Sequence, residues 1–449
     1  MSESSSTQPA TPDTRFSEPA AALTDAVAPE TAEAAAADAR LFPLLDRART
    51  SSRQLAAADR HGALLAIAEG LLQDAEGILA ANGSDVAAER HRGVAAAQLD
   101  RLTLTHDRLA AIADAVRQVA RLPDPLGRVL DGRTLASGVL MRKITVPFGV
   151  IGMIYESRPN VTVDAAVLGL KAGSSVVLRG SSNALASNRA LADSMRASLT
   201  RVGLSADAIQ LIDSPDRGLV TSLLRAHGRV DLVIPRGGAG LIRHVVENAR
   251  VPVIETGVGN CHVYVDDGAD LGMAHDIVIN AKVQRPGVCN AAENLLVHRS
   301  VAAPFLGTVL ASLRAAGVEL VGCERTRAID PAVGPATQQD YDTEFLNLKL
   351  AVRVVDDLDQ ALEHIAAHGT RHSEAIVTSD LARAERFRRE VDAAGVFVNA
   401  STRFNDGFEF GLGAEIGIST QKLHARGPMG LAEMVTYKYL LDGSGQVRG

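Results

Sequence analysis

Val150-Ile151-Gly152-Met153-Ile154 is a short apolar run in which no polar residue alternates with the apolar ones. Continuous runs of this length are typical of strands that are buried on both faces, as in a parallel sheet. Segments with helical spacing separate it from similar runs, so the chain is predicted to be α/β with helices on both faces of the sheet. The further runs are residues 176–178, 209–212, 232–234 and 253–254.

A second series of apolar runs begins at His262-Val263-Tyr264-Val265. These runs are also continuous and alternate with helical segments, so we expect a second doubly wound α/β domain with a parallel sheet. A cleft is expected where the two domains meet. The remaining runs are residues 295–297, 318–321, 351–355, 375–377 and 396–398.

Residues 129–147 have a strand-like period and stand just before the first sheet. The pair Asp131-Gly132 lies between two strand-like runs and predicts a β-hairpin. Residues 435–441 are expected to add a strand to it. A ribbon of this size has little core of its own, so we predict a small β arm that packs against a second subunit of a homo-oligomer.

Residues 1–35 consist mainly of Ala, Ser, Thr, Pro and Glu with almost no aliphatic spacing. Such a segment cannot offset its ordering entropy by burial, so it is predicted to be a disordered tail. Between residues 41 and 122, Leu and Ala recur at helical spacing, which predicts helices.

The overall composition argues against several classes of protein. The net charge is −7, and aromatic residues make up 3% of the chain with no Trp, which disfavours a general nucleic-acid-binding surface. No stretch has the ~20 uninterrupted apolar residues of a membrane span, and Glu3 stands where a signal peptide would be basic. The three cysteines and the histidines have neither disulfide nor metal spacing, so we expect a reducing, cytoplasmic setting and no metal.

Cys289 lies in the stretch Gln284-Arg285-Pro286-Gly287-Val288-Cys289-Asn290, between a helical segment and the apolar run 295–297. Pro286 and Gly287 end that helix and turn the chain, so the thiol is expected on a loop. A cysteine presented by a loop is a candidate nucleophile, and an inert small apolar side chain is the alternative interpretation.

Two glycine-containing turns follow predicted strands of the first sheet. They are Arg179-Gly180-Ser181-Ser182-Asn183 and Pro235-Arg236-Gly237-Gly238-Ala239-Gly240, and each leads into a helix whose free N–H groups suit phosphate. The common motif Gly-x-Gly-x-x-Gly follows neither of the first two runs. Taken alone, each turn is equally compatible with an ordinary strand-to-helix connection.

Together with Cys289 and with Glu255-Thr256-Gly257, these turns resemble the aldehyde dehydrogenase superfamily. Longer motifs resemble, more narrowly, the gamma-glutamyl phosphate reductase family, whose members are also called glutamate-5-semialdehyde dehydrogenases. This resemblance covers roughly residues 40–445. The motifs are Tyr155-Glu156-Ser157-Arg158-Pro159-Asn160-Val161-Thr162-Val163-Asp164, the stretch from Gln284 to Asn290, Gly411-Leu412-Gly413-Ala414-Glu415, and Ser419-Thr420-Gln421-Lys422-Leu423-His424-Ala425-Arg426-Gly427-Pro428.

The resemblance implies an NADP-dependent oxidoreductase. In this family NADPH reduces L-glutamate 5-phosphate to L-glutamate 5-semialdehyde and phosphate, the second step of proline synthesis from glutamate. The implied route is a thioester on Cys289 that accepts a hydride, and an upstream glutamate kinase is the implied metabolic partner. Two alternatives stay open: a related acylating or hydrolytic aldehyde dehydrogenase, and a catalytically silent member kept as a binding or assembly protein.

The resemblance also assigns roles to the predicted domains. Residues 36–128 and 148–261 are expected to form the NADP-binding domain, and residues 262–430 the catalytic domain. Residues 129–147 and 431–445 are expected to form the oligomerisation arm.

Four residues are implied in catalysis. Cys289 is the nucleophile, and we expect backbone dipoles or a nearby positive charge, with Arg285 as a candidate, to lower its pKa. The oxyanion that forms needs donors, and the backbone N–H of Cys289 together with either Ser157 or Asn160 is expected to supply them. Glu255 matches the water-activating glutamate of hydrolytic aldehyde dehydrogenases. Because water attack would waste the thioester, its role is expected to be reduced or altered, and a structural carboxylate is the alternative.

The cofactor is expected at the two glycine turns. No Asp or Glu occupies Arg179-Gly180-Ser181-Ser182, where a carboxylate would accept the ribose hydroxyls of NAD and repel the extra phosphate of NADP, so NADPH is predicted. Gly237 and Gly238 are expected near phosphate, and the resemblance places Glu344 at the nicotinamide ribose.

The implied substrate carries an acyl phosphate, an α-carboxylate and an α-ammonium, so arginine forks and an acceptor should line its pocket. The residues chosen for this role are Arg158, Arg285, Thr402 and Arg403. Three more residues of the family motifs are expected to have structural or intersubunit roles, namely Lys422, His424 and Arg426.

Overall fold

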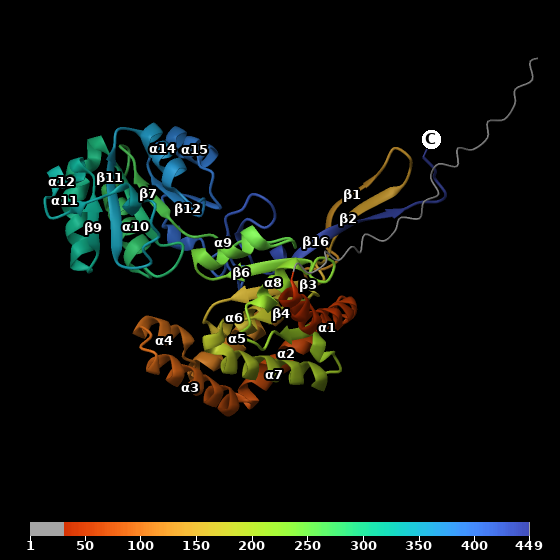
Figure 1. The fold of residues 1–449 in the computed structure, drawn as a ribbon. Helices are drawn as coiled ribbons and strands as arrows, with labels where there is room; N and C mark the ends of the chain where they lie inside the picture. Colours follow the sequence, from red (N-terminus) through yellow and green to blue (C-terminus); the bar gives the residue numbers. More distant parts are fainter. Residues whose placement is uncertain (1–30, 449) are drawn as a thin grey trace, which may run out of the picture.

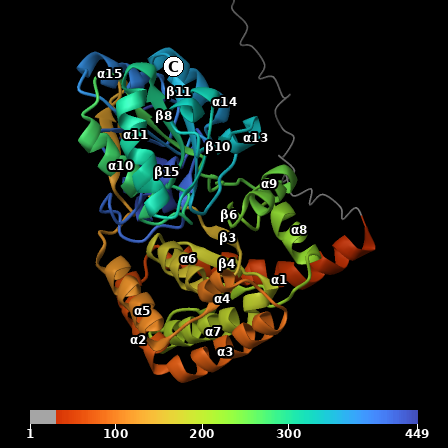
Figure 2. The same cartoon turned by 90° about the vertical axis from the view of Figure 1, so that its left-hand side faces the viewer.

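The computed structural model describes residues 31–448, which form two α/β domains and a three-stranded arm (Figure 1). The predicted tail lies outside the described residues except at its end, where residues 32–35 are helical because α1 begins at Ala32 with Thr31 as its N-cap. The arm extends away from both domains, and the second view shows the helices that cover each sheet (Figure 2).

The first domain is built on a four-stranded parallel sheet with the order β5-β4-β3-β6. Its strands are β3 (Val150–Tyr155), β4 (Ser175–Arg179), β5 (Ile209–Leu211) and β6 (Leu232–Arg236). Its helices are α1 (Ala32–Leu55), α2 (Arg60–Gln73), α3 (Ala75–His91), α4 (Ala96–Leu102), α5 (His106–Arg121), α6 (Pro159–Lys171), α7 (Leu185–Arg201), α8 (Gly218–Arg225) and α9 (Ala239–Asn248), with short turns η1 (Ser182–Ala184) and η2 (Ala206–Ala208).

Every residue of β3 is buried, which confirms the prediction of a strand covered on both faces. Ile151 and Met153 belong to an apolar core formed with α2, α5, α6 and α7, whereas Val150 and Ile154 belong to the core on the opposite face with α1 and α8. The predicted strand at 253–254 is reduced to a single bridge between Val253 and Val233 at the sheet edge.

The second domain has a seven-stranded parallel sheet with the order β10-β9-β11-β8-β7-β12-β13. Its strands are β7 (Cys261–Val265), β8 (Ala292–His298), β9 (Glu319–Gly322), β10 (Gly334–Pro335), β11 (Lys349–Val355), β12 (Ser373–Val377) and β13 (Gly395–Val398). Its helices are α10 (Leu271–Val283), α11 (Arg299–Ala315), α12 (Glu324–Ile329), α13 (Gln338–Tyr341), α14 (Leu358–His368) and α15 (Leu381–Glu390), followed by η3 (Thr402–Phe404), β14 (Ile418–Ser419), β15 (Gly427–Pro428) and η4 (Leu431–Met434).

The arm is an antiparallel sheet of β1 (Val129–Thr134), β2 (Leu140–Pro147) and β16 (Val435–Asp442), in the order β1-β2-β16. The predicted hairpin is present, but its turn lies at residues 135–138, where Leu135 N–H bonds to Val139 O. The prediction that Asp131-Gly132 forms the turn is wrong. That pair lies inside β1, beside a shift of register.

Candidate active site

Cys289 stands on a loop between α10 and β8, half-buried, at the wall of a cavity of about 610 Å³. The cavity lies where the carboxyl ends of β3, β4 and β6 face the second domain, so a cleft forms as predicted. Residues from both domains line it. The predicted site residues among them are Cys289, Ser157, Arg158, Ser181, Gly237, Gly238 and Glu344.

The backbone at Gly259 passes directly against the nucleophile. A Cβ on Gly259 would lie 1.5 Å from the carbonyl oxygen of Cys289, so only glycine fits there. The Gly259 N–H donates to Oε1 of Glu344 at 2.8 Å, and burial raises the pKa of Glu344. The same glycine therefore fixes both the nucleophile and the carboxylate that the resemblance places at the nicotinamide ribose.

The pKa of Cys289 differs from the sequence prediction. Burial raises it to about 11, and the Arg236 guanidinium opposes this shift, whereas Glu344 and Glu415 add to it. The expected lowering is therefore wrong for the protein without ligands. Arg236, rather than the candidate Arg285, is the cation that acts most strongly on the thiol.

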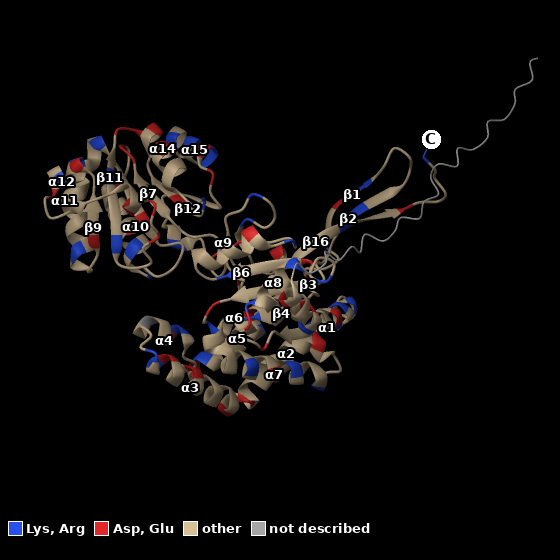
Figure 3. Ribbon diagram, in the orientation of Figure 1, with Lys and Arg blue, Asp and Glu red and all other residues tan. Residues whose placement is uncertain are grey.

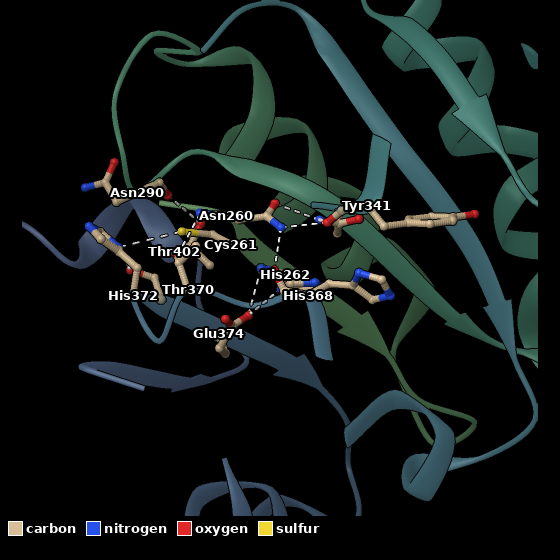
Figure 4. A network of polar contacts seen from close by, with 12 residues as sticks. Asn260, Cys261, His262, Asn290, Tyr341, His368, Thr370, His372, Glu374 and Thr402 are labelled. Carbon is tan, nitrogen blue, oxygen red and sulfur yellow. Dashed lines mark hydrogen bonds and ion pairs between the residues drawn. The ribbon is translucent and has the colours of Figure 1, made fainter. Parts of the chain in front are cut away.

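Buried hydrogen bonds hold the nucleophile loop from behind (Figure 4). The Cys261 thiol donates to the Cys289 carbonyl at 3.1 Å, and Oγ1 of Thr402 donates to the Asn290 carbonyl at 2.7 Å. The Asn290 amide in turn donates to the Asn405 carbonyl at 2.9 Å. Thr402 is fully buried in this network, so the structure gives it a role in fixing the loop and does not place it at the cavity as a substrate ligand.

The same hydrogen-bond network includes two side chains that can titrate, Cys261 and His372. Burial raises the pKa of Cys261, which keeps it a thiol that can donate, and lowers the pKa of His372 to about 3. His372 Nδ1 lies 3.7 Å from the Cys261 sulfur (Figure 4). On the neighbouring strand β12, Oε2 of Glu374 accepts the backbone N–H of His262 at 2.8 Å. The same oxygen lies 2.9 Å from Nδ1 of the His262 ring.

A buried ion pair closes the base of the nucleophile loop. Lys282, near the end of α10, pairs with Glu293, near the start of β8, and neither side chain is exposed. The other carboxylate oxygen of Glu293 accepts the N–H of Leu346 at 3.2 Å, and Leu346 lies on the cavity wall two residues after Glu344. The pair thus joins the nucleophile loop to the segment that carries Glu344.

The two candidates for the second oxyanion donor lie in different places. Ser157 lines the cavity, and its hydroxyl donates to Oδ1 of Asn183 at 2.6 Å. Asn160 is exposed on α6, outside the set of residues that line the cavity, and its amide donates to Asp164 at 3.0 Å. Burial raises the pKa of Asp164 to about 6.

Glu255 is separated from Cys289. It lines a second cavity of about 310 Å³, which shares Ala239 and residues 256–258 with the first, and its N–H donates to Gln421 Oε1 at 3.2 Å. The structure does not bring Glu255 to the cavity wall on which Cys289 lies.

The first glycine turn is only partly open to the cavity. Arg179 is largely buried, and its guanidinium donates to the carbonyls of Gly180 and, at 3.4 Å, of Pro215. Ser181 lines the cavity, and Ser182 begins the 3-10 turn η1 beside it.

The predicted substrate arginines surround Cys289 to different extents. Arg158 lines the cavity, and burial together with Arg236 and Arg101 lowers its pKa. Arg285 is exposed on the nucleophile loop, and Arg403 is half-buried and donates from Nε to Gln284 at 2.9 Å.

Sequence reasoning missed two arginines that line the same cavity, Arg101 and Arg236. Arg236 stands next to the glycines of its turn. An arginine at the end of a buried strand is itself a signal of a functional site, so the sequence could have identified it. Arg101 lies on α4 within a helical region that has no motif, so no local signal points to it.

The C-terminal motif, residues 419–428, makes structural contacts. Lys422 and Arg426 both pair with Asp392, at 3.0 and 2.7 Å, and His424 Nε2 lies 3.0 Å from the Glu433 carbonyl. These bonds hold the segment against the second domain and do not involve the cavity.

Among residues 31–448, no group of three or more His, Cys, Asp or Glu side chains could hold a metal ion, and no helix is long and apolar enough to cross a membrane. Figure 3 shows basic and acidic residues interspersed over the helices of both domains.

Comparisons with known proteins agree with this architecture. A sequence profile of the aldehyde dehydrogenase family matches residues 8–346. The gamma-glutamyl phosphate reductase of Moorella thermoacetica is 57% identical over 405 residues, which cover 90% of this chain and 97% of that protein. The enzyme of the same name from Thermobifida fusca is 55% identical over 406 residues, with the same coverage.

Solved structures give the same result. The crystal structure of gamma-glutamyl phosphate reductase from Thermotoga maritima matches with a TM-score of 0.90 and 47% identity, over 91% of this chain and 100% of that one. An acetylating aldehyde dehydrogenase from Geobacillus thermoglucosidasius shares only the fold, with a TM-score of 0.65 and 16% identity over 93% of this chain and 99% of that one. The chain therefore belongs to the aldehyde dehydrogenase family and, within it, to the gamma-glutamyl phosphate reductases.

Proposed function

We propose that this protein uses NADPH to reduce L-glutamate 5-phosphate to L-glutamate 5-semialdehyde and phosphate, the second step of proline synthesis from glutamate. The observation that carries the proposal is the position of Cys289, on the wall of a cavity that it shares with Glu344 and three arginines. The 57% identity to a protein named gamma-glutamyl phosphate reductase supports this choice of substrate over other acyl compounds.

Cys289 forms the covalent intermediate. Its sulfur attacks C5 of the substrate, so that a C–S bond forms and the C–O bond to the phosphoryl group breaks. The electron pair of that bond leaves with phosphate, which also carries away the thiol proton. The glutamyl group then remains on Cys289 as a thioester.

Donors for the oxyanion come from the nucleophile loop and from the segment between β3 and α6. The backbone N–H of Cys289 is one donor, and we assign the second to Ser157 because it lines the cavity, whereas Asn160 is exposed outside it. The Ser157 hydroxyl must then turn from Asn183 toward the substrate oxygen. Glu255 has a reduced or altered role, because water attack on the thioester would waste it.

The residues of the first cavity fit a nicotinamide dinucleotide. Ser181, the Gly237-Gly238 turn at the start of α9 and Glu344 line one cavity together with Cys289, and Gly238 is an N-cap without a side-chain cap, which leaves backbone N–H groups of α9 free for phosphate. When bound, NADPH supplies the hydride that replaces the sulfur on C5.

We also propose that NADPH is preferred over NADH. The turn Arg179-Gly180-Ser181-Ser182 would lie near the adenosine ribose and contains no carboxylate to repel the 2′-phosphate. A carboxylate from α3, Glu89, does line the cavity, but it pairs with Arg92. Comparable catalytic efficiency with the two cofactors would remove this part of the proposal.

The reverse reaction tests the proposed function. Wild-type protein with glutamate 5-semialdehyde, NADP⁺ and inorganic phosphate should form NADPH, seen by its absorbance, at a rate that depends on phosphate. Formation that is indifferent to phosphate would instead support a hydrolytic enzyme, and formation that requires coenzyme A would support an acylating one.

Three further assignments belong to this proposal. A glutamate kinase supplies the unstable acyl phosphate, as the reaction requires, and the arm joins subunits into a homo-oligomer. We place the enzyme in the reducing cytoplasm, and the free state of Cys261, Cys289 and Cys323 supports this location.

A further inference from the structure

Besides Arg403, which donates to Gln284, four guanidinium groups gather around Cys289 from different parts of the chain. Arg101 on α4, Arg158 before α6 and Arg236 at the end of β6 all line its cavity. Arg285 lies on the nucleophile loop, and its charge, like those of Arg236 and Arg101, acts on Arg158. Like charges brought together in this way repel one another, which is a cost in a protein without ligands.

No ion pair with a carboxylate closes this cluster, although the charges of Asp164 and Glu415 act on Arg236. Within residues 31–448, the side chains of Arg101, Arg158 and Arg236 form no ion pair with Asp or Glu and donate no hydrogen bond to a protein acceptor. Of the carboxylates on the cavity wall, Glu89 pairs with Arg92 and Glu344 accepts the N–H of Gly259. A third, Glu156, lies against Gly237. Unpaired guanidinium groups in a cavity indicate an anionic ligand.

Arg236 is held in place beside the nucleophile. Its backbone carbonyl accepts the N–H of Glu156 at 3.1 Å, which fixes the end of β6. Its guanidinium packs on Gly417, where a Cβ would come within 3.0 Å of Nη1. Of the charged groups, Arg236 acts most strongly on the Cys289 thiol.

Arg101 reaches the nucleophile loop from α4. Its Nη2 lies 3.6 Å from the position that a Cβ on Gly287 would take, so the small residue in the nucleophile loop leaves room for the guanidinium. Arg236 and Arg101 therefore approach the loop from β6 and from α4.

The chemistry of the substrate distinguishes its two anionic groups. The phosphoryl group is bonded through oxygen to the carbon that the sulfur attacks, so it must lie next to Cys289. The α-carboxylate is at the other end of the molecule. Arg236, the cation that acts most strongly on the thiol, is therefore the group expected to bind the phosphoryl group. A guanidinium can bind two phosphoryl oxygens at once.

We propose that Arg236 is a catalytic residue that binds the phosphoryl group beside Cys289, with Arg101 as a second cation, and stabilises the phosphate as it leaves. As the C–O bond breaks, its electron pair moves to an oxygen that faces these guanidinium groups. Arg158 and Arg285 then remain for the α-carboxylate. This assignment rests on the proposed function and deepens it.

The test is the phosphate-dependent reverse reaction with Arg236→Gln and Arg236→Lys. Loss of a charge-assisted contact should raise the KM for inorganic phosphate by about tenfold or more in Arg236→Gln, with a smaller rise in Arg236→Lys. The KM for NADP⁺ should change much less. The matched control is Arg189→Gln. It removes a surface arginine of α7 that pairs with Asp213, and it should leave both constants unchanged.

A second measurement does not require turnover. Inorganic phosphate should protect Cys289 of the wild-type protein from iodoacetamide, and this protection should weaken in both Arg236 variants but not in Arg189→Gln. Unchanged KM and protection in the Arg236 variants would overturn the assignment, as would an effect confined to NADP⁺. If the wild-type reaction itself does not depend on phosphate, the proposed function fails instead.

Discussion

At the scale of the residue, the thiol of Cys289 is a poor nucleophile in the protein without ligands, because burial raises its pKa. Its pKa of about 11 in the protein without ligands means that only a small fraction is thiolate at neutral pH.

Alkylation of the free enzyme tests this pKa. Below the pKa the thiolate fraction rises about tenfold for each pH unit, so the rate of iodoacetamide labelling at Cys289 should rise about tenfold per unit from pH 7 to pH 9 without a plateau. Mapping the labelled peptide separates Cys289 from Cys261 and Cys323. A plateau near pH 7 would show that the pKa is lowered instead.

The buried ring of His364 on α14 predicts that the stability of the protein depends on pH. Burial, with His262 and His368 nearby, lowers its pKa to about 2, so the ring stays neutral in the folded protein. The unfolded chain protonates near pH 6.5, and stability is therefore complete above that pH and is lost below it. From pH 7.5 to 5.5, urea unfolding should show a loss of about 1.4 kcal/mol more in the wild type than in His364→Gln.

Only the difference between the wild type and His364→Gln isolates the effect of His364 in that experiment. Buried carboxyl groups such as Glu415, whose pKa burial raises, shift stability in the opposite direction over the same range. Their contribution is common to the wild type and to His364→Gln and cancels in the difference. Equal losses in the two proteins would mean that His364 titrates normally.

At the scale of the element, the Lys282–Glu293 pair holds α10, β8 and the Leu346 segment together. Glu293→Gln keeps an acceptor for the Leu346 N–H but leaves the Lys282 ammonium buried without a countercharge. We expect a loss of roughly 3–5 kcal/mol of unfolding free energy, measured by urea unfolding.

The double variant Lys282→Met with Glu293→Gln is the control for this prediction. Because it removes the orphaned charge, it should recover a large part of the lost stability. Simple addition of the two single effects would show that the groups do not interact.

The elements themselves were predictable to different degrees. β3 and the series that follows it could be predicted because burial on both faces leaves a continuous apolar pattern in the sequence. The arm was predicted as well, but Asp131-Gly132 marked an irregularity inside β1, while the turn used Gly138 at a φ of 83°. Local propensity does not distinguish a glycine in a bulge from one in a turn.

The site was less predictable than the fold for a physical reason. The motifs pointed to Cys289, Glu344, Ser181 and the Gly237-Gly238 turn, which line one cavity in the structure. Only the residues of the glycine turns follow strands of the parallel sheet, whereas Cys289 and Glu344 precede strands of the second sheet. Thr402 was misplaced because its bond to the Asn290 carbonyl joins residues 112 apart in the sequence. The electrostatic effect of Arg236 on the thiol likewise acts between the two domains, and no local pattern records it.

At the scale of the whole molecule, the arm presents an apolar face to solvent. Tyr437, Tyr439 and Leu441 alternate along β16, so their side chains share one face of the strand, and each is more than half exposed. The arm reaches away from both domains (Figure 1), so neither domain covers this face. Exposed apolar residues on a thin sheet are typical of a subunit interface.

Leu441→Glu should therefore lower the molar mass in solution. A carboxylate cannot be buried in an apolar interface without a large cost, so light scattering should detect a smaller assembly at equal protein concentration. The matched control is Leu381→Glu on α15, where an even more exposed leucine lies outside the arm. Equal masses for the two variants would exclude β16 from the interface.

The most direct test of the proposed chemistry is to detect the glutamyl group on Cys289. Wild-type protein mixed with glutamate 5-semialdehyde and NADP⁺ without phosphate, then quenched in acid, should show by peptide mass spectrometry a glutamyl adduct on the peptide that contains Cys289. Added phosphate should discharge the adduct, and Cys289→Ser should neither form it nor turn over. An adduct on another residue, or undiminished turnover by Cys289→Ser, would contradict the thioester route.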